Sequence, residues 1–274
     1  MNDQIILIYC ICDDLLKILK KKEDIQSKMN SAEIMTIAIT AALFFGANFS
    51  RARIFLKGHG YIRNMLSESR LNRRLHLIDR SIWETIFYAL SKIFSDENDT
   101  CEYVVDSMPV EVCMNMRSYR CRLLNGKKFI GYCKAKKKFY YGFKLHLICT
   151  TKGQPVEFII TPASMADISA FRIMEIDRPQ ESIIYGDKAY TDYSFEKSLE
   201  EIEHIKLLAD RKSNAKKQHS GCTDFILKRS RKMIETAFSR LVSLFPRKIH
   251  AVTKEGFLLK LVVFMLTFSL KFFL

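Results

Sequence analysis

The spacing of apolar residues separates a helical first part of the chain from a mixed second part. In residues 1–95 apolar positions recur at intervals of three and four, as at Ile5, Ile6 and Tyr9. The run EIMTIAITAALFFGA, residues 33–47, is apolar almost all round and predicts a buried helix. Because no stretch alternates between apolar and polar residues, we expect residues 1–95 to be all helical.

After the polar segment SDENDTC, residues 95–101, the pattern changes to that of strands. The run EYVVDSMPVEV is rich in β-branched residues but is broken by Pro109. The alternating run FYYGFKLHLICT is joined to PVEFIITP by a turn containing Gly153, which predicts a hairpin. The segments SIIYGD and HIKLLAD are short apolar strands separated by a polar helix.

Two helical segments end the chain. One runs from about residue 225 to 245, and the other is the very apolar segment 257–274. The second contains Lys260 and Lys271 and lacks a clean span of about 20 apolar residues, so we predict a buried helix and keep a membrane anchor as the alternative. Strands that alternate with helices favour an α/β fold, a mixed sheet flanked by helices.

Charge narrows the class of partner. The chain has 44 Lys and Arg against 30 Asp and Glu, a formal net charge of +14, and 30 of these basic residues lie in 101–274. This surplus favours polyanionic partners, but by itself it leaves nucleic acid, anionic membrane and acidic protein open. The eight cysteines include no CxxC pair and no Cys/His set with zinc spacing, so we expect reduced thiols in a cytosolic protein.

Three acidic residues are candidates for a metal site. Asp106 follows the apolar run 103–105, and Asp187 follows the run 183–186. Ligands of such sheets gather outside the carboxyl ends of strands, so the two acids are expected to converge. Glu235 lies at the margin of a helical apolar stripe, where we expect it to face partly inward beside the sheet. Divalent cations such as Mg²⁺ prefer such carboxylate ligands, and a pair of ions can activate a water or a 3′-hydroxyl.

Each acid also has a structural interpretation. Asp106 can cap the turn before Pro109, Asp187 can cap the helix that follows it, and Glu235 can pair with Arg231. Spacing alone does not decide between these interpretations and a metal site.

Several ordered motifs resemble those of the DDE transposases of bacterial insertion sequences. They are VVDSMPV, the hairpin YYGFKLHLICTTKGQPVEFIITPASMADISAF, the strand end IIYGDKAY and the helix RKMIETAFSRL, which lie between about residues 100 and 265. SESRLNRRLHLI extends the resemblance toward the N-terminus. The resemblance implies a ribonuclease-H-like sheet in residues 99–274, preceded by a helical region, 1–98, for DNA-end binding or dimerisation.

The same resemblance implies a reaction and its catalytic residues. It implies cleavage of DNA strands at the ends of an insertion sequence and their transfer to target DNA, with two Mg²⁺ or Mn²⁺ ions. The three catalytic acids of the family correspond to Asp106, Asp187 and Glu235, and its conserved Arg corresponds to Arg231. The partners are then the terminal inverted repeats and target DNA, and the protein is expected to be a cytoplasmic, nucleoid-associated homodimer without membrane contact.

Two positions depart from the family pattern. Many relatives have a Tyr where this chain has Lys228, and a Lys where it has Val242. Those residues handle terminal phosphates and flanking bases, and Lys228, Lys232 and Arg240 are candidates to replace them. The rival interpretation is a transposon-derived protein that binds DNA without cutting it, but all three acids are present.

Two basic stretches are candidate DNA contacts. Residues 115–144 contain ten basic side chains, no acid and several interleaved aromatic rings, which suits phosphates and unpaired bases. Residues 211–217 and 228–232 lead into the Glu235 helix. The alternatives are solvated loops and strand aromatics that face a core. The predicted DNA contacts are Arg231, Lys134, Lys136, Lys137, Lys138, Lys188, Arg211, Lys212, Lys228 and Lys232.

His146 and Asp167 are further polar residues whose roles the sequence bears on. His146 lies in the alternating strand beside Lys144, where it is either a partner of a metal ligand or a histidine with an ordinary hydrogen bond. Asp167 in SMADIS is expected to cap the next helix and to have no catalytic role.

Overall fold

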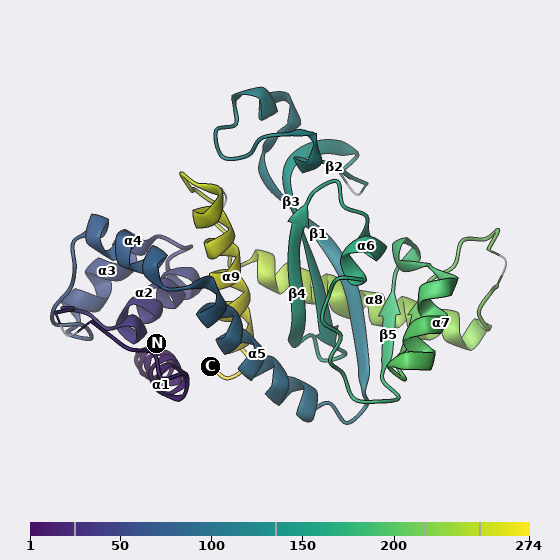
Figure 1. Cartoon of the computed structure of the whole chain (residues 1–274), viewed down its shortest axis with the longest axis horizontal. Coiled ribbons are helices and arrows are strands. Elements are labelled where there is room, and N and C mark those ends of the chain that lie inside the picture. Colours follow the sequence, from purple (N-terminus) through teal and green to yellow (C-terminus); the bar gives the residue numbers. More distant parts are fainter. Residues whose placement is uncertain (25, 135, 216, 247) are drawn as a thin grey trace. The chain divides into compact units, whose positions relative to one another are not determined.

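The computed structural model of the chain divides it into two compact units. It describes residues 1–24, 26–134, 136–215, 217–246 and 248–274. Ala135 and Lys216, which fall within the two predicted basic stretches, lie outside the described residues. Unit 1 comprises Met1–Leu90 and Arg240–Leu274, and unit 2 comprises Ser91–Ser239. Figure 1 shows the course of the chain through both units.

Unit 1 is built from helices. They are α1 (Asn2–Ile18), α2 (Ser31–Phe44), α3 (Phe49–Gly58), α4 (Glu68–Leu77), the first part of α5 (Arg80–Asp96) and α9 (Lys254–Leu270). The described part of residues 1–95 contains helices and no strand, so the prediction of a helical N-terminal region is confirmed. The apolar helix α2 is buried along nearly its whole length and packs against α1, α3 and α9.

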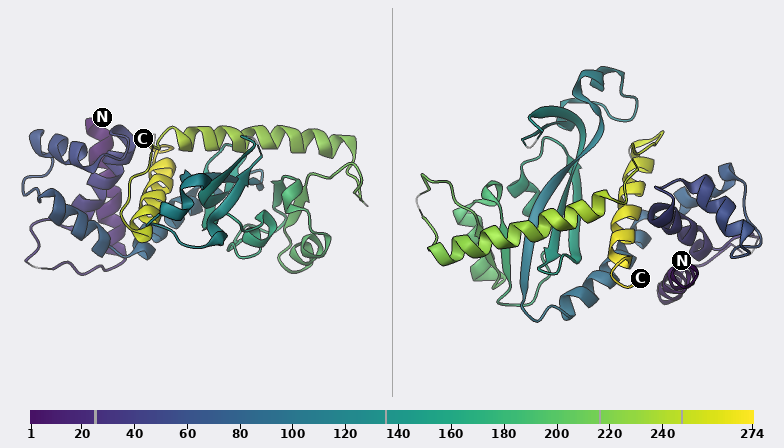
Figure 2. Two further views of the ribbon diagram at one scale, coloured as in Figure 1. Left: turned by 90° about the horizontal axis from the view of Figure 1, so that it is seen from above. Right: turned by 180° about the vertical axis from the view of Figure 1, so that it is seen from behind.

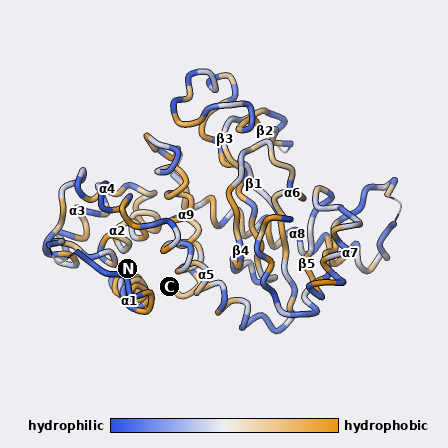
Figure 3. The backbone as a smooth tube through the Cα atoms, in the orientation of Figure 1, coloured by the Kyte–Doolittle hydropathy of each residue, from blue (hydrophilic) through white to orange (hydrophobic). Residues whose placement is uncertain are grey.

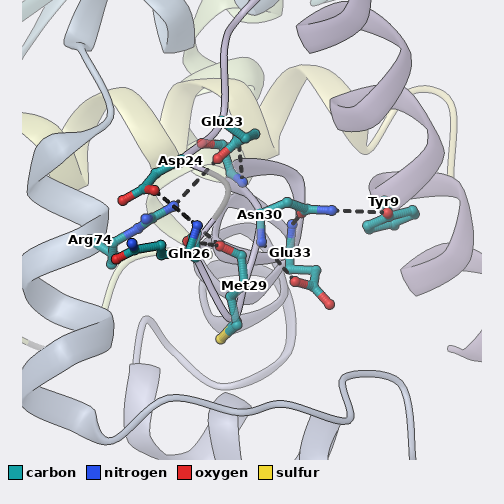
Figure 4. Close-up of polar contacts among 10 residues, drawn as sticks. Tyr9, Glu23, Asp24, Gln26, Met29, Asn30, Glu33 and Arg74 are labelled. Carbon is teal, nitrogen blue, oxygen red and sulfur yellow. Dashed lines mark hydrogen bonds and ion pairs between the residues drawn. The ribbon is translucent and has the colours of Figure 1, made fainter.

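Polar contacts hold the segment that leads into α2 (Figure 4). Asn30 and Glu33 form a capping box, in which the Asn30 side chain accepts from the Glu33 N–H and the Glu33 carboxylate accepts from the Asn30 N–H. Arg74 of α4 donates to the Met29 carbonyl oxygen at 3.2 Å and pairs with Glu23 at 3.4 Å. These contacts give Arg74 a structural role.

The C-terminal helix is a core element of unit 1. In α9 all but two of the residues from Gly256 to Leu270 are buried, as the apolar pattern predicts. Among the described residues no single helix is long and apolar enough to cross a membrane. In the part of the chain that the structure describes, α2 and α3 together have the length and composition for it, but they are bent by 111° relative to each other.

Unit 2 contains a mixed sheet of six strands. The strands are β1 (Glu102–Met114), β2 (Ile130–Cys133), β3 (Lys138–Thr150), β4 (Pro155–Pro162), β5 (Ile183–Gly186) and β6 (Lys206–Ala209). The order is β2-β3-β1-β5-β6, and β4 pairs with the remaining length of β3. The pairs of β1, β2 and β4 with β3 are antiparallel, whereas β1–β5 and β5–β6 are parallel. The predicted hairpin is β3–β4, with Gly153 at φ +82° in its turn.

Helices cover both faces of this sheet. The α-helices are α6 (Asp167–Phe171), α7 (Tyr193–Ile202) and α8 (Gly221–Val242), and the short 3-10 helices are η1 (Asn115–Arg120), η2 (Lys127–Phe129) and η3 (Lys188–Tyr190). The two views of Figure 2 place α8 on one face and α6 and α7 on the other. The strands are largely apolar, whereas the loop before α8 is largely polar (Figure 3). This arrangement confirms the predicted ribonuclease-H-like α/β fold.

One strand differs from the prediction. Asp106 does not close β1, which continues through Pro109 to Met114. Beyond Val104 this strand pairs only with β3, because β5 ends at Gly186. A proline is tolerated where a strand has a neighbour on one side only, since no second ladder needs its missing N–H. Pro109 therefore does not break β1.

The observed units also bear on the expected division at residues 98 and 99. The second unit begins at Ser91, close to that position, but residues 240–274 associate with the N-terminal helices. The expected region 99–274 therefore contains a C-terminal segment that belongs to the other compact unit.

Candidate active site

Asp106 and Asp187 lie at the same level on neighbouring parallel strands. The last β1–β5 pair is Val104 with Tyr185, and each acid is two residues beyond its member of that pair. Adjacent strands lie about 4.8 Å apart, so this register brings the two carboxylates to one place on the sheet. Parallel strand alignment thereby joins two residues that are far apart in the sequence.

Main-chain groups orient one oxygen of each carboxylate. The Oδ1 atom of Asp106 accepts from the Ser107 N–H at 2.7 Å, and that of Asp187 accepts from the Ala189 N–H at 2.7 Å. Asp187 is thereby the N-cap of η3, so its predicted capping role and its place in the site coexist. Among the described residues, neither Oδ2 atom takes part in a hydrogen bond or an ion pair.

Burial makes both carboxylates hard to ionise. Loss of solvent raises the pKa of Asp106 to about 7, and the nearby charges of Asp187 and Asp167 add to the shift. Burial also raises the pKa of Asp187, again with a contribution from Asp167. The Arg231 guanidinium opposes both shifts. A pair of half-buried carboxylates that raise each other's cost of ionisation is suited to a bound cation.

The third predicted acid, Glu235, lies on helix α8. The buried face of this helix includes Leu227, Ile234 and Ala237. Arg231 stands at the side of this face and acts on both Asp106 and Asp187, and Glu235 follows one helical turn later. Glu235 is exposed rather than turned partly inward, because it lies farther round the helix from the buried face.

The carboxylates fit a hard divalent cation only in part. Asp106 and Asp187 provide the oxygen ligands that Mg²⁺ and Mn²⁺ prefer. Within the described ranges, however, no three or more His, Cys, Asp or Glu side chains are gathered closely enough to hold a metal ion. The donor set that the fold brings together is therefore the aspartate pair, and Glu235 stands apart from it.

Behind Asp106, on the α6 side of the sheet, lies a network that the sequence did not predict. Asp167 accepts from the Ser107 hydroxyl at 2.7 Å and from the Lys144 ammonium at 3.0 Å. Its side chain does not cap α6, whose N-cap residue is Ala166, so that prediction is wrong. The partners of Asp167 are 60 and 23 residues away, and only the β1–β3 pairing brings them together.

His146 belongs to the same network. It is fully buried, its Nε2 atom lies 3.0 Å from the Thr161 hydroxyl, and its Nδ1 atom is 3.7 Å from Asp167. Burial lowers the pKa of His146 to about 4, so the ring is neutral at physiological pH. The histidine is thus a hydrogen-bonded strand residue that also approaches Asp167.

Tyr190 closes the interior side of this cluster. It is fully buried, and its hydroxyl lies beside Ser107, although no partner in the described part of the chain meets normal hydrogen-bond geometry. Burial raises the pKa of Tyr190, and the charges of Asp167, Asp106 and Asp187 add to this shift. Gly186 makes room for this ring, because a Cβ there would lie 3.1 Å from the Tyr190 Cβ.

A further carboxylate stands beside the pair. Asp210 directly follows β6, and the last β5–β6 pair is Gly186 with Ala209, so Asp210 is level with Asp187. Its Oδ2 atom lies 3.7 Å from both the Lys188 ammonium and the Arg231 guanidinium. Arg231 therefore pairs with Asp210. The sequence had suggested Glu235 as its alternative partner.

The predicted basic residues of the β2–β3 turn are accessible. Lys134, Lys136, Lys137 and Lys138 are exposed, and Lys138 pairs with Glu111 at 2.8 Å. The charge of Lys134 opposes the burial that raises the pKa of Asp187. Two exposed aromatic rings, Tyr132 and Phe139, lie beside each other on the same hairpin with centroids 5.0 Å apart.

The second basic stretch is only partly accessible. Lys212, Lys228 and Lys232 are exposed. Arg211 is 9% exposed, binds both oxygens of Glu196 with its terminal nitrogens and stacks on Tyr193. Arg211 therefore has a structural role, and its burial does not favour the DNA contact predicted from the sequence.

Comparison with known proteins identifies a family. The family described as "Transposase DDE domain" matches residues 96–250, which is more than half of the chain and includes all three predicted acids. No curated protein and no solved structure matches the chain.

Proposed function

Since the chain belongs to the family of transposase DDE domains, we propose that it cleaves DNA strands at the ends of an insertion sequence and joins them to target DNA. The observation that carries the proposal is the aspartate pair, which two neighbouring strands place at one level with an oxygen of each carboxylate left unbonded among the described residues. The proposed reaction depends on a divalent metal ion, and the proposed ligands of that ion are Asp106, Asp187 and Glu235.

The proposed roles of the acids follow from their surroundings. Asp106 and Asp187 each present an Oδ2 atom while a main-chain N–H holds Oδ1, so both are oriented before a ligand arrives. Glu235 is exposed one turn beyond Arg231, and an exposed side chain changes rotamer readily, so it can complete the set. Two Mg²⁺ or Mn²⁺ ions bound there would supply an activated water or 3′-hydroxyl and stabilise the leaving oxygen.

Three of the proposed DNA contacts interact with acids at this site. Arg231 and Lys188 lie beside Asp210, and the charge of Lys134 in the β2–β3 turn acts on Asp187. Cations placed so near buried acids offset the repulsion between those acids and a DNA phosphate. The exposed Lys136, Lys137, Lys138, Lys212, Lys228 and Lys232 extend the proposed surface.

The remaining proposals concern the whole protein. A homodimer would let two active sites act on the two ends of one element. The helical region 1–98 would serve DNA-end binding or dimerisation, and the protein would be found with the nucleoid.

A cleavage assay tests the proposed function. The full chain is incubated with DNA that carries the sequences flanking its coding region, with Mg²⁺, with Mn²⁺ or with a chelator. We expect strand breaks at the element ends that require the metal, followed by joined products. If the protein binds these ends but leaves them intact with either metal, it is the inactive DNA-binding relative instead.

A further inference from the structure

Ser107 connects the two faces of the sheet at the active site. Its main-chain N–H donates to the Asp106 carboxylate, and its hydroxyl donates to Asp167 of α6. Successive residues of a strand point to opposite faces, so Asp106 faces the side of α8 while the Ser107 side chain faces α6. The position of this one residue therefore affects both the acid and the network behind it.

Asp167 is itself held firmly. The Lys144 ammonium donates to Asp167 at 3.0 Å and to the Met165 carbonyl oxygen at 2.9 Å, so it ties the start of α6 to β3. Both side chains of the pair are about one-fifth exposed, and a charge-assisted hydrogen bond so largely removed from solvent is stronger than a surface ion pair. Three links thus run in series from Lys144 to Asp167, to Ser107 and to Asp106.

The strand needs such support at this point. Beyond Val104, β1 has no ladder to β5 among the described residues, so the main chain at Asp106 and Ser107 is paired on its β3 edge only. A free strand side allows the backbone to shift unless side-chain contacts fix it. Ser107, which makes the contact with Asp167, lies three residues after Val104 of the last β1–β5 pair.

We propose that Asp167 is a positioning residue for Asp106: held by Lys144, it fixes Ser107 and thereby the N–H group that orients the Asp106 carboxylate toward Asp187. The proposal rests on the proposed function, because it takes Asp106 as a metal ligand. Side chains that orient metal ligands typically contribute about 10- to 100-fold to metal affinity. Asp167 acts in this way without contacting the substrate.

Metal binding without DNA gives the direct test. Mn²⁺ affinity is measured by calorimetry on the full chain and on the variants Asp167→Asn, Ser107→Ala and Ser107→Thr. We expect Mn²⁺ to bind about 10- to 100-fold more weakly to Asp167→Asn and Ser107→Ala, and close to normally to Ser107→Thr, which keeps the hydroxyl. The double variant should be no worse than either single one, because both break the same link.

Matched controls separate positioning from general stability. Glu102 lies on the same strand and accepts from the Tyr185 hydroxyl at 2.9 Å, so Glu102→Gln removes a comparable carboxylate away from the acids. It should leave the Mn²⁺ affinity unchanged. The melting temperature of each variant without metal shows whether it is folded.

Two outcomes are distinguishable. If Asp106→Asn abolishes Mn²⁺ binding while Asp167→Asn and Ser107→Ala bind as the wild type does, the positioning role is wrong and the metal site stands. If Asp106→Asn binds Mn²⁺ as well as the wild type, the proposed metal site itself is wrong.

Discussion

Burial dominates the chemistry of Asp106, and its consequence can be measured as a pH dependence. A pKa of about 7 in the folded protein, against 3.8 for the unperturbed group, means that the folded state holds this proton more tightly than the unfolded chain. Without metal, the contribution of Asp106 to stability therefore falls as the pH rises from about 4 to about 7. The contribution of Asp187 to stability also falls as the pH rises, because its pKa is raised. The contribution of His146 rises with pH, because its pKa is lowered.

The first prediction isolates Asp106 by difference. Urea unfolding of the wild type and of Asp106→Asn is compared at pH 5 and pH 8 without metal. The wild type should lose more stability than the variant over this interval, because only the wild type has to ionise this buried acid. Mn²⁺ affinity of the wild type should rise over the same interval, since binding displaces the proton. Equal losses of stability in the two proteins would contradict the raised pKa of Asp106.

The second prediction concerns Asp210. Its carboxylate lies 3.7 Å from both Lys188 and Arg231, so it competes with DNA phosphates for these cations. Because partly exposed ion pairs are worth about 1 kcal/mol or less, Asp210→Asn should tighten DNA binding by roughly two- to fivefold. Fluorescence anisotropy measures the change. Glu201→Gln, which removes the same charge from the exposed pair with Lys197, is the control and should have a smaller effect.

Single residues also show what the sequence can and cannot predict. Asp106 and Asp187 could be found because each follows an apolar run and matches a motif. Asp167 could not, because a carboxylate at the start of a helix resembles a cap and its partners lie on β1 and β3. The ion pair of Arg211 was not predictable either, because a basic stretch does not reveal that Glu196, 15 residues earlier, binds one of its members.

At the scale of elements, hydrophobic periodicity predicted most of unit 2. The β3–β4 hairpin, the short strands β5 and β6 and the helix α8 all occur near their expected positions. The extent of β1 was not predictable, because the sequence does not show that β5 ends at Gly186 and leaves Pro109 with a neighbour on one side. Strand pairing is a long-range property, and it decides where a proline is tolerated.

The third prediction tests the β2–β3 turn as a DNA contact. Each neutralised phosphate contributes about −0.9 to the slope of log affinity against log salt. Lys138 is already paired with Glu111, so among the described residues we count three free lysines in the set Lys134, Lys136, Lys137 and Lys138. Replacing all four by Ala should make the slope shallower by the contribution of about three phosphate contacts. Replacing Lys20, Lys21 and Lys22 after α1 removes similar charge from unit 1. If both sets change the slope equally, the turn is not a specific phosphate contact.

At the scale of the whole molecule, the sequence does not show which distant segments share a compact unit. The composition changes near residue 98, which is close to the start of unit 2 at Ser91. Nothing in the pattern of α9 shows that it packs with α2 of the N-terminal region, because an apolar helix can be buried against any element. The distribution of charge, by contrast, can be counted from the sequence, which places 30 of the 44 basic residues in 101–274.

The fourth prediction concerns assembly. If two active sites act on two ends, the full chain should form a complex with two protein copies when it is given DNA carrying an element end. Sedimentation velocity at several protein concentrations measures the mass of this complex. A complex that stays at one copy for each DNA end at every concentration would argue against the proposed homodimer.

The central claim is that Asp106, Asp187 and Glu235 together perform metal-dependent strand cleavage. Cleavage of end-labelled DNA is measured in Mg²⁺ for Asp106→Asn, Asp187→Asn and Glu235→Gln, alongside the DNA affinity of each variant. Each variant should cut at less than about one hundredth of the wild-type rate, since even residues that only orient metal ligands are worth about 10- to 100-fold. DNA affinity should be retained or increased, because each change removes a negative charge. A variant that still cuts at the wild-type rate would contradict the claim for that residue.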